Sequence, residues 1–490
     1  MLRLSELIAR AGIEASILGN AEVEIAAITG DSRQVVPGAL FAALPGAIAD
    51  GTRYIPDAIR LGAAVLLVAE RSRTDLAVSA TLVRVKSVRA AITALAAAFY
   101  PEQPAHCYAV TGTDGKTSTA DFVRQLAKLS GRDAASIGTL GLRSQHAQIN
   151  AAFPAVNTSP EPVLLHHTLQ QLARAGVSDV AIETSSHGLD QKRADGVKFI
   201  AGAFTNLARD HLDYHATLED YFAAKARLFS QVLSPGAIAV LNRDDARYDA
   251  LKAMAGARDL TIISFGTHAD ADYRIAAIQP TADGLDAQVV VAGVTHQLTL
   301  PFYGAFQLSN MLTAIGLLSA SGLEASALIA LLPSLKGVPG RLEKIAISKQ
   351  GAPIFIDYAH TPAALENILK TLRPHTAGKL HVVFGCGGDR DAGKRPEMGR
   401  AASQYADDVI VTDDNPRSEN PAAIRAAILA AAQGATEIEG RASAIAVATK
   451  KLQAGDVLVV AGKGHETTQT IGTQIHPFND ADEIRKAVAA

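Results

Sequence analysis

One segment limits what this chain can fold into more than any other: Thr111-Gly112-Thr113-Asp114-Gly115-Lys116-Thr117-Ser118-Thr119. An apolar run from Cys107 to Val110 precedes it and favours a β-strand, and apolar residues at helical spacing follow it from Phe122 to Leu129. A strand, a glycine loop ending in Lys-Thr and a helix form the local structure that cradles the phosphates of a nucleoside triphosphate. The segment therefore predicts a nucleotide-binding domain with this loop between a strand and a helix.

The residue types in the loop suit that chemistry. Its glycines let backbone N–H groups approach phosphate oxygens, and the helix N-terminus adds positive partial charge. Lys116 can pair with the β and γ oxygens, and the Thr117 hydroxyl can reach a phosphate-bound Mg²⁺. The spacing is shorter than the generic G-x-x-x-x-G-K-[ST], because Gly112 stands three residues before Gly115. An ordinary turn rich in Gly and Thr between a strand and a helix is the alternative interpretation.

The composition is that of a globular protein with several domains. A chain of 490 residues is too long for one core, so we expect two to four domains. Hydrophobic residues make up 48% and charged residues 19%, which excludes a disordered chain. The net charge of −3 gives no support for nucleic acid or an anionic membrane as the main partner. Cys107 and Cys386 lie in separate apolar contexts, which fits a reducing cytoplasm and argues against a disulfide framework or a cysteine zinc site.

No secretion signal or membrane span is expected. The first eight residues include Glu6 and lack a long apolar run. The most apolar stretch, 311–335, is interrupted by serines, Gly322 and Glu324, and we interpret it as two helices joined at Gly322.

Two seams rich in Pro and Gly divide the chain into three segments. One is residues 101–104, before the strand of the phosphate loop, and the other is residues 336–340. They predict domains at 1–104, 105–338 and 339–490. Strand-like runs alternate with helical patterns in the second and third segments, which indicates parallel sheets with helices on both faces. Ligands of such sheets bind at the carboxyl ends of the strands.

Polar residues follow the strand-like run 180–182 of the middle segment. Glu183 comes directly after it, where an acid can bind the Mg²⁺ of the triphosphate, although a solvated glutamate at a strand end is the alternative. The loop that follows is dense in hydrogen-bond donors, which suits an anionic or polyhydroxylated substrate. These donors are Thr184, Ser185, Ser186, His187, Gln191, Lys192 and Arg193.

Two histidines further along are weaker candidates for metal ligands. His211 and His215 are spaced i,i+4, which on a helix would place both on one face. Their surroundings do not form the H-E-x-x-H motif, so a hydrogen-bonded structural histidine is the default interpretation of each.

Lys225 is the most unusual charged residue of the middle segment. It falls within an apolar helical face made of Leu218, Tyr221, Phe222, Leu228 and Phe229. Lysine is almost never fully buried unless it is paired. One interpretation is a lysine at the edge of the face whose ammonium reaches water. The other is a desolvated amine of lowered pKa near the nucleotide, which can take up CO₂ as a carbamate and bind a metal. The sequence leaves both interpretations open.

Three strand ends of the last segment carry charge. Arg390, Arg417 and Glu466 each follow an apolar strand-like run. If the three strands share one parallel sheet, these side chains converge at one edge. Two guanidinium groups and a carboxylate suit a small ligand that carries both carboxylate and ammonium groups. Salt bridges between loops, each of little energetic value, are the alternative.

With these motifs in this order, the chain resembles the Mur ligases, ATP-dependent amide-forming enzymes of bacterial peptidoglycan precursor synthesis. The resemblance covers essentially the whole chain. It rests on the phosphate loop and on motifs at residues 31–33, 157–160, 183–193, 210–215, 339–341, 357–362, 387–395, 414–417 and 462–466. In the family, the sequence Asp-Asn-Pro-Arg of residues 414–417 marks the enzymes that add diaminopimelate, whereas lysine-adding relatives lack its arginine. This agrees with the charge argument, because diaminopimelate is lysine with an extra carboxylate, for which Arg417 is the natural partner.

The resemblance implies an α/β fold of three domains. These are a smaller N-terminal α/β domain that binds UDP, a central P-loop ATPase-type domain with a parallel sheet, and a C-terminal Rossmann-like domain that binds the amino acid. The implied reaction joins meso-diaminopimelate to UDP-N-acetylmuramoyl-L-alanyl-D-glutamate, with ATP and Mg²⁺, in the cytoplasm. It serves peptidoglycan synthesis, and through it cell-wall biogenesis, cell shape, cell division and the cell cycle. We expect a monomer.

The resemblance also implies a role for particular residues. ATP is expected at Gly112, Thr113, Asp114, Gly115, Lys116, Thr117, Ser118, Asn310, Arg341 and Asp357. The UDP-linked substrate is expected at Ser32, Asn157, Thr158, Ser159, Ser185, Gln191 and Arg193. Diaminopimelate is expected at Arg390, Asp414, Asn415, Pro416, Arg417, Gly462 and Glu466. Two Mg²⁺ ions are expected, one at Thr117 with Glu183 and one at His211 with carbamylated Lys225 (N6-carboxylysine). The expected catalytic residues are Lys116, Glu183, His211 and Lys225.

The chain departs from the family pattern at two positions. Asp114 stands where the phosphate loop usually has Asn, and a carboxylate near phosphates is unfavourable unless it faces away or reaches Mg²⁺. Gln307 stands where the G-x-F-N-x-x-N element usually has its first Asn. Both changes can alter ATP affinity, but Lys116, Thr117 and Asn310 are kept.

The implied mechanism proceeds through an acyl phosphate. The γ-carboxylate of the substrate's D-glutamate attacks the γ-phosphate of ATP, and the diaminopimelate amine then displaces phosphate while domain closure excludes water. Two alternatives stand beside it. One is a sister ligase that adds lysine or another amino acid, against which Arg417 argues. The other is a nucleotide-binding switch without ligase activity, against which the intact loop, Glu183 and Lys225 argue.

Overall fold

The computed structural model describes residues 2–45, 50–72, 80–154, 157–211 and 214–490. Leu212 and Asp213 of the histidine motif therefore lie outside the described residues. The chain divides into two compact units. Unit 1 is Met1–Gly266 with Thr313–Leu328, and unit 2 is Thr267–Leu312 with Ile329–Ala490. Within the described part of the chain, no helix is both long and apolar enough to cross a membrane.

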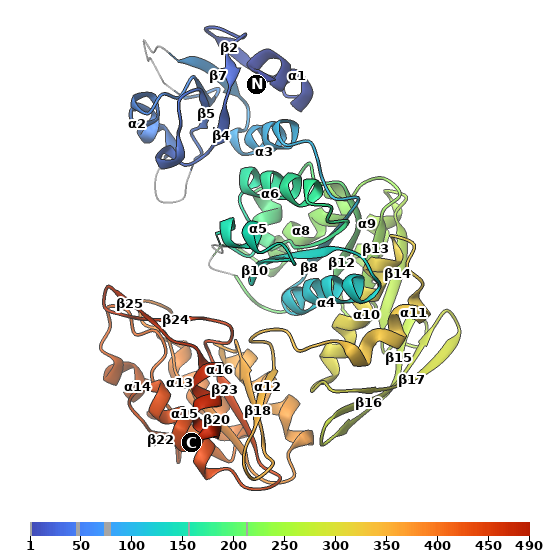
Figure 1. The fold of residues 1–490 in the computed structure, drawn as a ribbon, viewed down its shortest axis with the longest axis vertical. Coiled ribbons are helices and arrows are strands. Elements are labelled where there is room, and N and C mark those ends of the chain that lie inside the picture. The colour runs from blue at the N-terminus through green and yellow to red at the C-terminus, as the bar shows by residue number, and fades with distance from the viewer. Residues whose placement is uncertain (1, 46–49, 73–79, 155–156, 212–213) are drawn as a thin grey trace. The chain divides into compact units, whose positions relative to one another are not determined.

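The first part of unit 1 is a small α/β layer structure (Figure 1). Its described elements are β1 (Leu2–Arg3), α1 (Leu4–Ala11), β2 (Ser16–Leu18), β3 (Glu24–Ile25), β4 (Ala27–Thr29), the 3₁₀ helix η1 (Ser32–Gln34), β5 (Ala39–Ala42), the 3₁₀ helix η2 (Gly51–Tyr54), α2 (Ile55–Arg60), β6 (Val65–Ala69), β7 (Thr81–Val85) and α3 (Val88–Phe99). The main sheet has the order β2-β7-β6-β5-β4, and all its neighbouring pairs are parallel except β2 with β7. Apolar residues of α1 and α3 cover one face, and those of α2 cover the other.

The rest of unit 1 contains the strand and helix predicted on either side of the phosphate loop. The described elements are β8 (His106–Thr111), α4 (Lys116–Leu129), β9 (Ala134–Gly138), β10 (Gly141–Arg143), α5 (Ala147–Ala152), α6 (Pro162–Arg174), β11 (Asp179–Glu183), α7 (Ser186–Asp190), β12 (Phe199–Phe204), α8 (Leu218–Arg227), the π-helix η3 (Leu228–Val232), β13 (Ile238–Asn242), α9 (Tyr248–Gly256) and β14 (Thr261–Gly266). The strand order is β10-β9-β11-β8-β12-β13-β14, and only β10 is antiparallel to its neighbour. Because β8 lies between β11 and β12, the loops that follow these three strands meet at one edge of the sheet.

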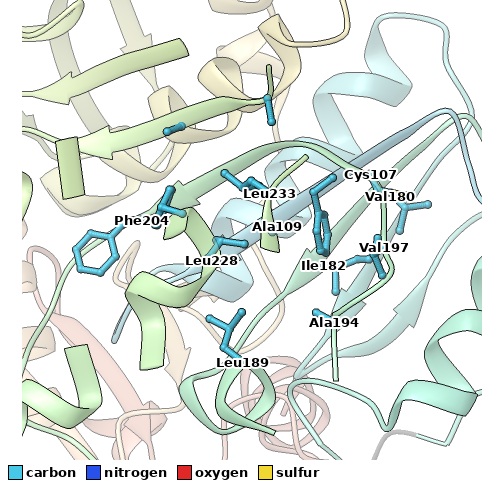
Figure 2. Packing of buried hydrophobic residues seen from close by; sticks show 14 of the residues in the cluster. Cys107, Ala109, Val180, Ile182, Leu189, Ala194, Val197, Phe204, Leu228 and Leu233 are labelled. Carbon is cyan, nitrogen blue, oxygen red and sulfur yellow. The ribbon is translucent and has the colours of Figure 1, made fainter. Parts of the chain in front are cut away.

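Alternation along the strands builds the core of this sheet. Cys107 and Ala109 of β8 point to the same face as Val180 and Ile182 of β11, because successive side chains of a strand point to opposite faces. Figure 2 shows these residues packed with side chains of α7, η3 and the segment after it, including Leu189, Leu228 and Leu233. Helix α4 packs on β9 and β11 with buried residues that belong to the opposite face. The rigid sheet thereby fixes where β8 ends and the loop begins.

Two apolar helices lie where the chain passes from unit 2 to unit 1 and then back to unit 2. They are α10 (Ala305–Ser319) and α11 (Ala325–Leu331), followed by the 3₁₀ helix η4 (Leu332–Ser334). Gly322 lies between them with φ of 82°, in the left-handed region that glycine adopts at low cost. The predicted pair of helices joined at Gly322 is therefore confirmed. Unit 2 begins with an antiparallel meander of β15 (Tyr273–Thr281), β16 (Gly284–Val291) and β17 (Val294–Leu300).

The main sheet of unit 2 carries the three charged strand ends. Its described elements are β18 (Glu343–Ile347), β19 (Pro353–Asp357), α12 (Pro362–Leu372), the 3₁₀ helix η5 (Arg373–His375), β20 (Leu380–Phe384), α13 (Lys394–Tyr405), β21 (Asp408–Val411), α14 (Pro421–Leu429), β22 (Thr436–Glu437), α15 (Arg441–Lys451), β23 (Val457–Ala461), β24 (Thr468–Ile471), β25 (Gln474–Pro477) and α16 (Asp480–Ala489). The order is β18-β19-β23-β20-β21-β22, with all pairs parallel except β18 with β19. Helices α12, α13 and α14 cover one face, and α15 and α16 cover the other (Figure 1). The strands β20, β21 and β23 thus share one parallel sheet, as the charge argument required.

Candidate functional site

The phosphate loop has a backbone that only glycine allows at two positions. Gly112 has φ of 145° and Gly115 has φ of 83°. A Cβ on Gly112 would collide with Thr205 Oγ1, so the loop approaches the end of β12 too closely for any side chain there. The N–H of Thr113 donates to Asn206 O at 2.9 Å. The loop is therefore anchored from the strand beside β8, and α4 begins immediately after it at Lys116.

Asp114, where the loop departs from the family pattern, is exposed. The contacts that hold it come from its backbone: its N–H donates to Asn206 Oδ1 at 2.9 Å, and its carbonyl accepts from Thr205 Oγ1 at 2.5 Å. A carboxylate in water is well solvated and carries little penalty, so the substitution is compatible with the loop conformation.

Lys116 lies over the loop that it follows. Its Nζ donates to Gly112 O at 2.9 Å and to Thr113 O at 2.7 Å. With the N-terminus of α4, this ammonium makes the loop a positively charged concavity at the carboxyl end of β8. The residues present therefore fit the phosphates of a nucleoside triphosphate.

Glu183 is buried, with only 2% of its surface exposed. Its Oε1 accepts from the N–H of Thr139 at 2.9 Å, and its Oε2 accepts from Thr139 Oγ1 at 3.1 Å and from Thr117 Oγ1 at 3.0 Å. The interpretation as a solvated strand-end glutamate is therefore wrong. A carboxylate and a hydroxyl beside a phosphate loop are the oxygen ligands that Mg²⁺ takes together with substrate phosphates, so this donor set fits the metal.

Lys225 is buried beside the same loop, with 1% of its surface exposed. Its Nζ donates to Gly112 O at 2.7 Å and lies 4.3 Å from the centroid of the Tyr221 ring. The interpretation in which the ammonium reaches water is therefore wrong. Burial, and next the positive charge of Lys116, lower the pKa of Lys225 well below its usual value. The predicted apolar face holds except for Leu218, which is exposed.

The two histidines do not lie on a helix in the described residues. His211 has φ of 53°, which a right-handed helix cannot continue, and the N–H of His215 donates to His211 O at 3.0 Å. The shared helix face, which was the weaker interpretation of this spacing, is therefore excluded by the backbone of His211. The loop nevertheless gathers both rings around His187, whose centroid lies 4.9 Å from that of His211 and 5.6 Å from that of His215. His215 is buried, whereas the His211 side chain is 44% exposed.

Four of the residues expected to hold the UDP-linked substrate form one network. Ser159 Oγ donates to Glu183 O at 3.0 Å and lies 3.1 Å from Ser185 Oγ. Arg193 donates to Ser159 O at 2.8 Å and to Gln191 Oε1 at 2.8 Å. This network leads from the backbone carbonyl of Glu183 to a group of polar side chains at the same sheet edge.

The other three residues of that set lie outside the network. Thr158 lies beside this network, because its Oγ1 is 3.1 Å from the Oγ1 of Thr139. Asn157 is exposed. Ser32 lies on η1, which follows β4 in the small N-terminal sheet, so it belongs to a different part of unit 1.

Sequence reasoning missed three residues that hold this site. Thr139 follows β9 and donates twice to Glu183, and Asn206 follows β12 and holds the phosphate loop. Arg89 of α3 donates to Gln191 Oε1 at 3.3 Å. The strand-end rule would have indicated Thr139 and Asn206 if β9 and β12 had been identified as neighbours of the strand that carries the loop. No signal in the sequence singles out Arg89.

Unit 2 brings together residues that the resemblance assigned to ATP. The carboxylate of Asp357 accepts from the N–H of Leu342 at 2.7 Å and from that of Ala359 at 2.8 Å. Buried Gln307 donates to Arg341 O at 3.3 Å, so the residue that departs from the pattern positions the arginine backbone. The Arg341 guanidinium lies 5.0 Å from the centroid of the Tyr358 ring. Asn310 is buried on α10.

The charged strand ends of unit 2 meet at one edge of its sheet. Asn415 Nδ2 donates to Glu466 Oε2 at 2.9 Å. Arg417 has φ of 49° and donates from Nη1 to Gly388 O at 2.7 Å, which joins the loops after β20 and β21. A Cβ on Gly462 would lie 2.8 Å from Asp414 Oδ2, so the loops after β21 and β23 are also in close contact.

The remaining two residues of this set differ in exposure. Pro416 is buried, and its carbonyl lies so close to Gly388 that a Cβ there would collide with it. Arg390 is exposed, and its Nη1 donates to its neighbour, Asp389 O, at 3.4 Å. Arg390 is therefore at the sheet edge but is not held by the other two loops.

Comparison with known proteins identifies the protein family that has this arrangement. Three family descriptions match: "Mur ligase family, catalytic domain" over residues 24–100, "Mur ligase middle domain" over 110–318, and "Mur ligase, glutamate ligase domain" over 340–464. The UDP-N-acetylmuramoyl-L-alanyl-D-glutamate–2,6-diaminopimelate ligase of Mesorhizobium japonicum is 47% identical over 96% of both chains, and that of Caulobacter vibrioides is 47% identical over 95% of both. A solved structure of a ligase of the same name has a TM-score of 0.71 at 33% identity and covers 100% of this chain and 99% of its own. These matches confirm the predicted three-domain α/β fold.

Proposed function

This chain belongs to the Mur ligase family, and from that premise we propose that it is the ATP-dependent ligase that adds meso-diaminopimelate to UDP-N-acetylmuramoyl-L-alanyl-D-glutamate in peptidoglycan precursor synthesis. The observation that supports it most is the pairing of two sites in one chain. One is a phosphate loop with a buried acid and a buried lysine, and the other is a loop cluster with an arginine and a carboxylate. An acid–amine ligase needs both.

The phosphate-loop site supports phosphoryl transfer by positioning and charge. Backbone N–H groups of the loop, the N-terminus of α4 and Lys116 neutralise the phosphates of ATP. The γ-carboxylate of the substrate's D-glutamate attacks the γ-phosphorus, which forms an acyl phosphate and releases ADP. The diaminopimelate amine then attacks the acyl carbon, and phosphate leaves. No side chain of the chain forms a covalent bond in either step.

Mg²⁺ is part of the proposal, at Thr117 with Glu183 and at His211 with Lys225. When bound, it would neutralise negative charge on the phosphates. Thr139 holds the Glu183 carboxylate at both oxygens, which orients it toward the loop. The lowered pKa of Lys225 supports a neutral amine, and a neutral amine reacts with CO₂ to form the carbamate that would serve as a ligand.

The three segments have separate roles in the proposal. Residues 1–104 hold the UDP part of the substrate, residues 105–338 hold ATP and the substrate dipeptide, and residues 339–490 hold diaminopimelate. Because the reaction uses ATP and a nucleotide-linked precursor, we place it in the cytoplasm, with the enzyme as a monomer.

Release of ADP tests the function. The full chain is assayed with ATP, Mg²⁺, the UDP-linked dipeptide and either diaminopimelate, lysine or no amino acid. We expect steady ADP release that requires both the dipeptide and diaminopimelate. Equal release with lysine would instead support the sister ligase, and no release with any amino acid would support the nucleotide-binding switch.

Two variants on one helix provide the matched control. Lys116→Met removes the ammonium over the phosphate loop and is expected to abolish ADP release. Lys128→Met changes an exposed lysine in the last turn of the same helix and is expected to leave it unchanged. Comparable rates for the two variants would contradict the role of the loop.

The carbamate has its own test. Intact-protein mass spectrometry under non-acidic conditions, with isotopically labelled CO₂, is expected to show labelled CO₂ on wild-type protein and none on Lys225→Ala. Lys225→Ala is also expected to be nearly inactive. A fully active Lys225→Ala enzyme would remove Lys225 from the site.

A further inference from the structure

Lys463, in the loop after β23, is a completely buried lysine with no role in the proposal so far. Its exposed fraction is 0%. Its Nζ donates to Glu466 Oε2 at 2.7 Å, to Thr468 O at 2.7 Å and to Asn415 Oδ1 at 3.1 Å. An ammonium group has three N–H donors and no acceptor, so this environment uses each donor once. A buried charge persists only when it is paired and hydrogen-bonded in this way.

The first consequence is the orientation of the Asn415 amide. Its Oδ1 accepts from Lys463 and from the N–H of Thr470 at 2.9 Å. An amide oxygen has two lone pairs, and both are used here. The amide nitrogen must therefore face the other way, toward Glu466 Oε2 at 2.9 Å. Without the Lys463 ammonium, Oδ1 of Asn415 loses one of the two donors that fix its position relative to Nδ2.

The second consequence is the presentation of Glu466. Its Oε2 accepts from both Lys463 and Asn415, while Oε1 has no hydrogen-bond donor among the described residues. The Glu466 side chain is 32% exposed. One carboxylate oxygen is thus held by the protein, and the other is available to a ligand at the edge of the sheet.

The charged and titratable groups around Glu466 come from several elements. They are Lys463 and His465 of its own loop, Tyr358 after β19, and Arg441 of α15. Burial by itself raises the pKa of Glu466, but the hydrogen bond and the charge of Lys463, with the bond from Asn415, outweigh it and hold the pKa below its usual value.

We propose that Lys463 is a positioning residue for the incoming amino acid, because its ammonium holds Asn415 and Glu466 in the one geometry that presents Oε1 of Glu466 to a substrate ammonium group. This inference rests on the proposed function, which places diaminopimelate at these loops. Lys463 itself donates all three of its protons to the protein and does not contact the substrate.

The test is Lys463→Met, which keeps the length of the side chain and removes its charge. We expect KM for diaminopimelate to rise by about tenfold or more, because a charge-assisted network that orders two ligand-facing groups is lost. KM for ATP and for the UDP-linked dipeptide should stay within about twofold. The hydrogen bonds of Lys463 act only on the groups that they directly contact, and those groups belong to the loops proposed to bind diaminopimelate. A loss of stability alone would lower activity toward all three substrates together.

A pH profile separates positioning from a merely structural role. Lys463 lowers the pKa of Glu466, so its removal lets the carboxylate take up a proton at higher pH, and the acid side of kcat/KM for diaminopimelate should move to higher pH. In a Glu466→Gln background there is no carboxylate to protonate, so Lys463→Met should then cause no such shift. An equal shift in both backgrounds would overturn the inference.

Controls keep the outcome decisive. Lys451→Met makes the same change at a partly exposed lysine, paired with Asp408 at the opposite edge of the sheet, and should leave each KM unchanged. If Lys463→Met is insoluble, Lys463→Gln removes the charge while retaining a hydrogen-bonding group and is judged by the same measurements. A wild-type enzyme without diaminopimelate-dependent ADP release would refute the proposed function. An active wild type with an unchanged KM and pH profile in the Lys463 variant would refute the role of Lys463 alone.

Discussion

The buried ion pair between Arg441 and Asp480 makes the sharpest prediction about stability. The guanidinium donates to Asp480 Oδ1 at 2.6 Å and to Oδ2 at 2.7 Å, and both side chains have an exposed fraction of 0%. Arg441 also donates to Ala461 O at 2.9 Å and to Asp413 O at 3.4 Å. The pair therefore joins α16 to the ends of β21 and β23, directly beneath the loops proposed to bind the amino acid.

Asp480→Asn keeps the shape of the side chain and removes its charge. The arginine then stays buried without the carboxylate to which it is hydrogen-bonded, and breaking one side of a buried pair in this way costs about 3 to 5 kcal/mol. Since about 1.4 kcal/mol corresponds to a factor of ten in an equilibrium constant, the opening equilibrium of α16 should rise by two to nearly four orders of magnitude.

Hydrogen exchange of the whole chain measures this locally. The amides of α16 should exchange faster in Asp480→Asn by about that factor, under conditions where exchange reports the opening equilibrium. A local measurement is needed because the chain divides into two compact units and need not unfold in a single step.

Asp482→Asn is the matched control. It makes the same change two residues along the same helix, in an exposed pair with Arg485 whose side chains are 63% and 58% exposed. Exposed pairs contribute less than about 1 kcal/mol, so exchange should change little. The double variant Arg441→Met/Asp480→Leu removes both charges and should be far less destabilised than Asp480→Asn. Equal effects of Asp480→Asn and Asp482→Asn, or a double variant as unstable as Asp480→Asn, would refute the reasoning.

Three further predictions concern binding and pH. Arg417→Ala should lower kcat/KM for diaminopimelate by about tenfold or more with little change in KM for ATP, because a guanidinium–carboxylate contact is lost; the exposed Arg400→Ala serves as the control, and unchanged kinetics would remove Arg417 from specificity. Thr139→Val removes the hydrogen bond from the Thr139 hydroxyl to Glu183 and should weaken Mg²⁺ binding. The Mg²⁺ concentration that gives half-maximal ADP release should therefore rise by about 10- to 100-fold in an Mg²⁺ titration, and an unchanged value would count against this role. Burial lowers the pKa of His465 from 6.5 to about 4, so the unfolded chain binds more protons between these values; unit 2 should lose stability as pH falls through that window, by no more than about 3 kcal/mol, and His465→Gln should remove this loss in denaturation followed at several pH values.

Much of the fold could be predicted from local patterns. The phosphate loop indicated β8 and α4, and Gly322 indicated the break between α10 and α11, because glycine spacing and apolar periodicity are local properties of the chain. The shared helix face that the spacing of His211 and His215 allowed is absent for an equally local reason that the pattern does not reveal. The i,i+4 spacing satisfies a helix, but His211 adopts a positive φ that stops one.

The candidate site was predictable only where a residue type is informative by itself. Lys225 stood out because a lysine within an apolar face is unusual, and the structure places it against Gly112 O. Asn206 and Thr139 did not stand out, because asparagine and threonine are ordinary in loops. Their importance comes from the strand order, which sets β12 beside β8 and β9 beside β11, and strand order is not a local property of the sequence.

The two sites share one arrangement. In each, a carboxylate expected to bind a metal or the substrate is held by neighbouring side chains: Thr139 and Thr117 for Glu183, and Lys463 and Asn415 for Glu466. The holding groups come from the ends of neighbouring strands, from helix α4 for Glu183 and from its own loop for Glu466, so the geometry of each carboxylate depends on more than one element. A substitution in the carboxylate removes a contact, whereas a substitution in a holding group changes the orientation and the pKa of a carboxylate that is still present. The second class should therefore be recognised by shifted pH profiles and metal dependence, and the Thr139 and Lys463 variants are its two independent tests.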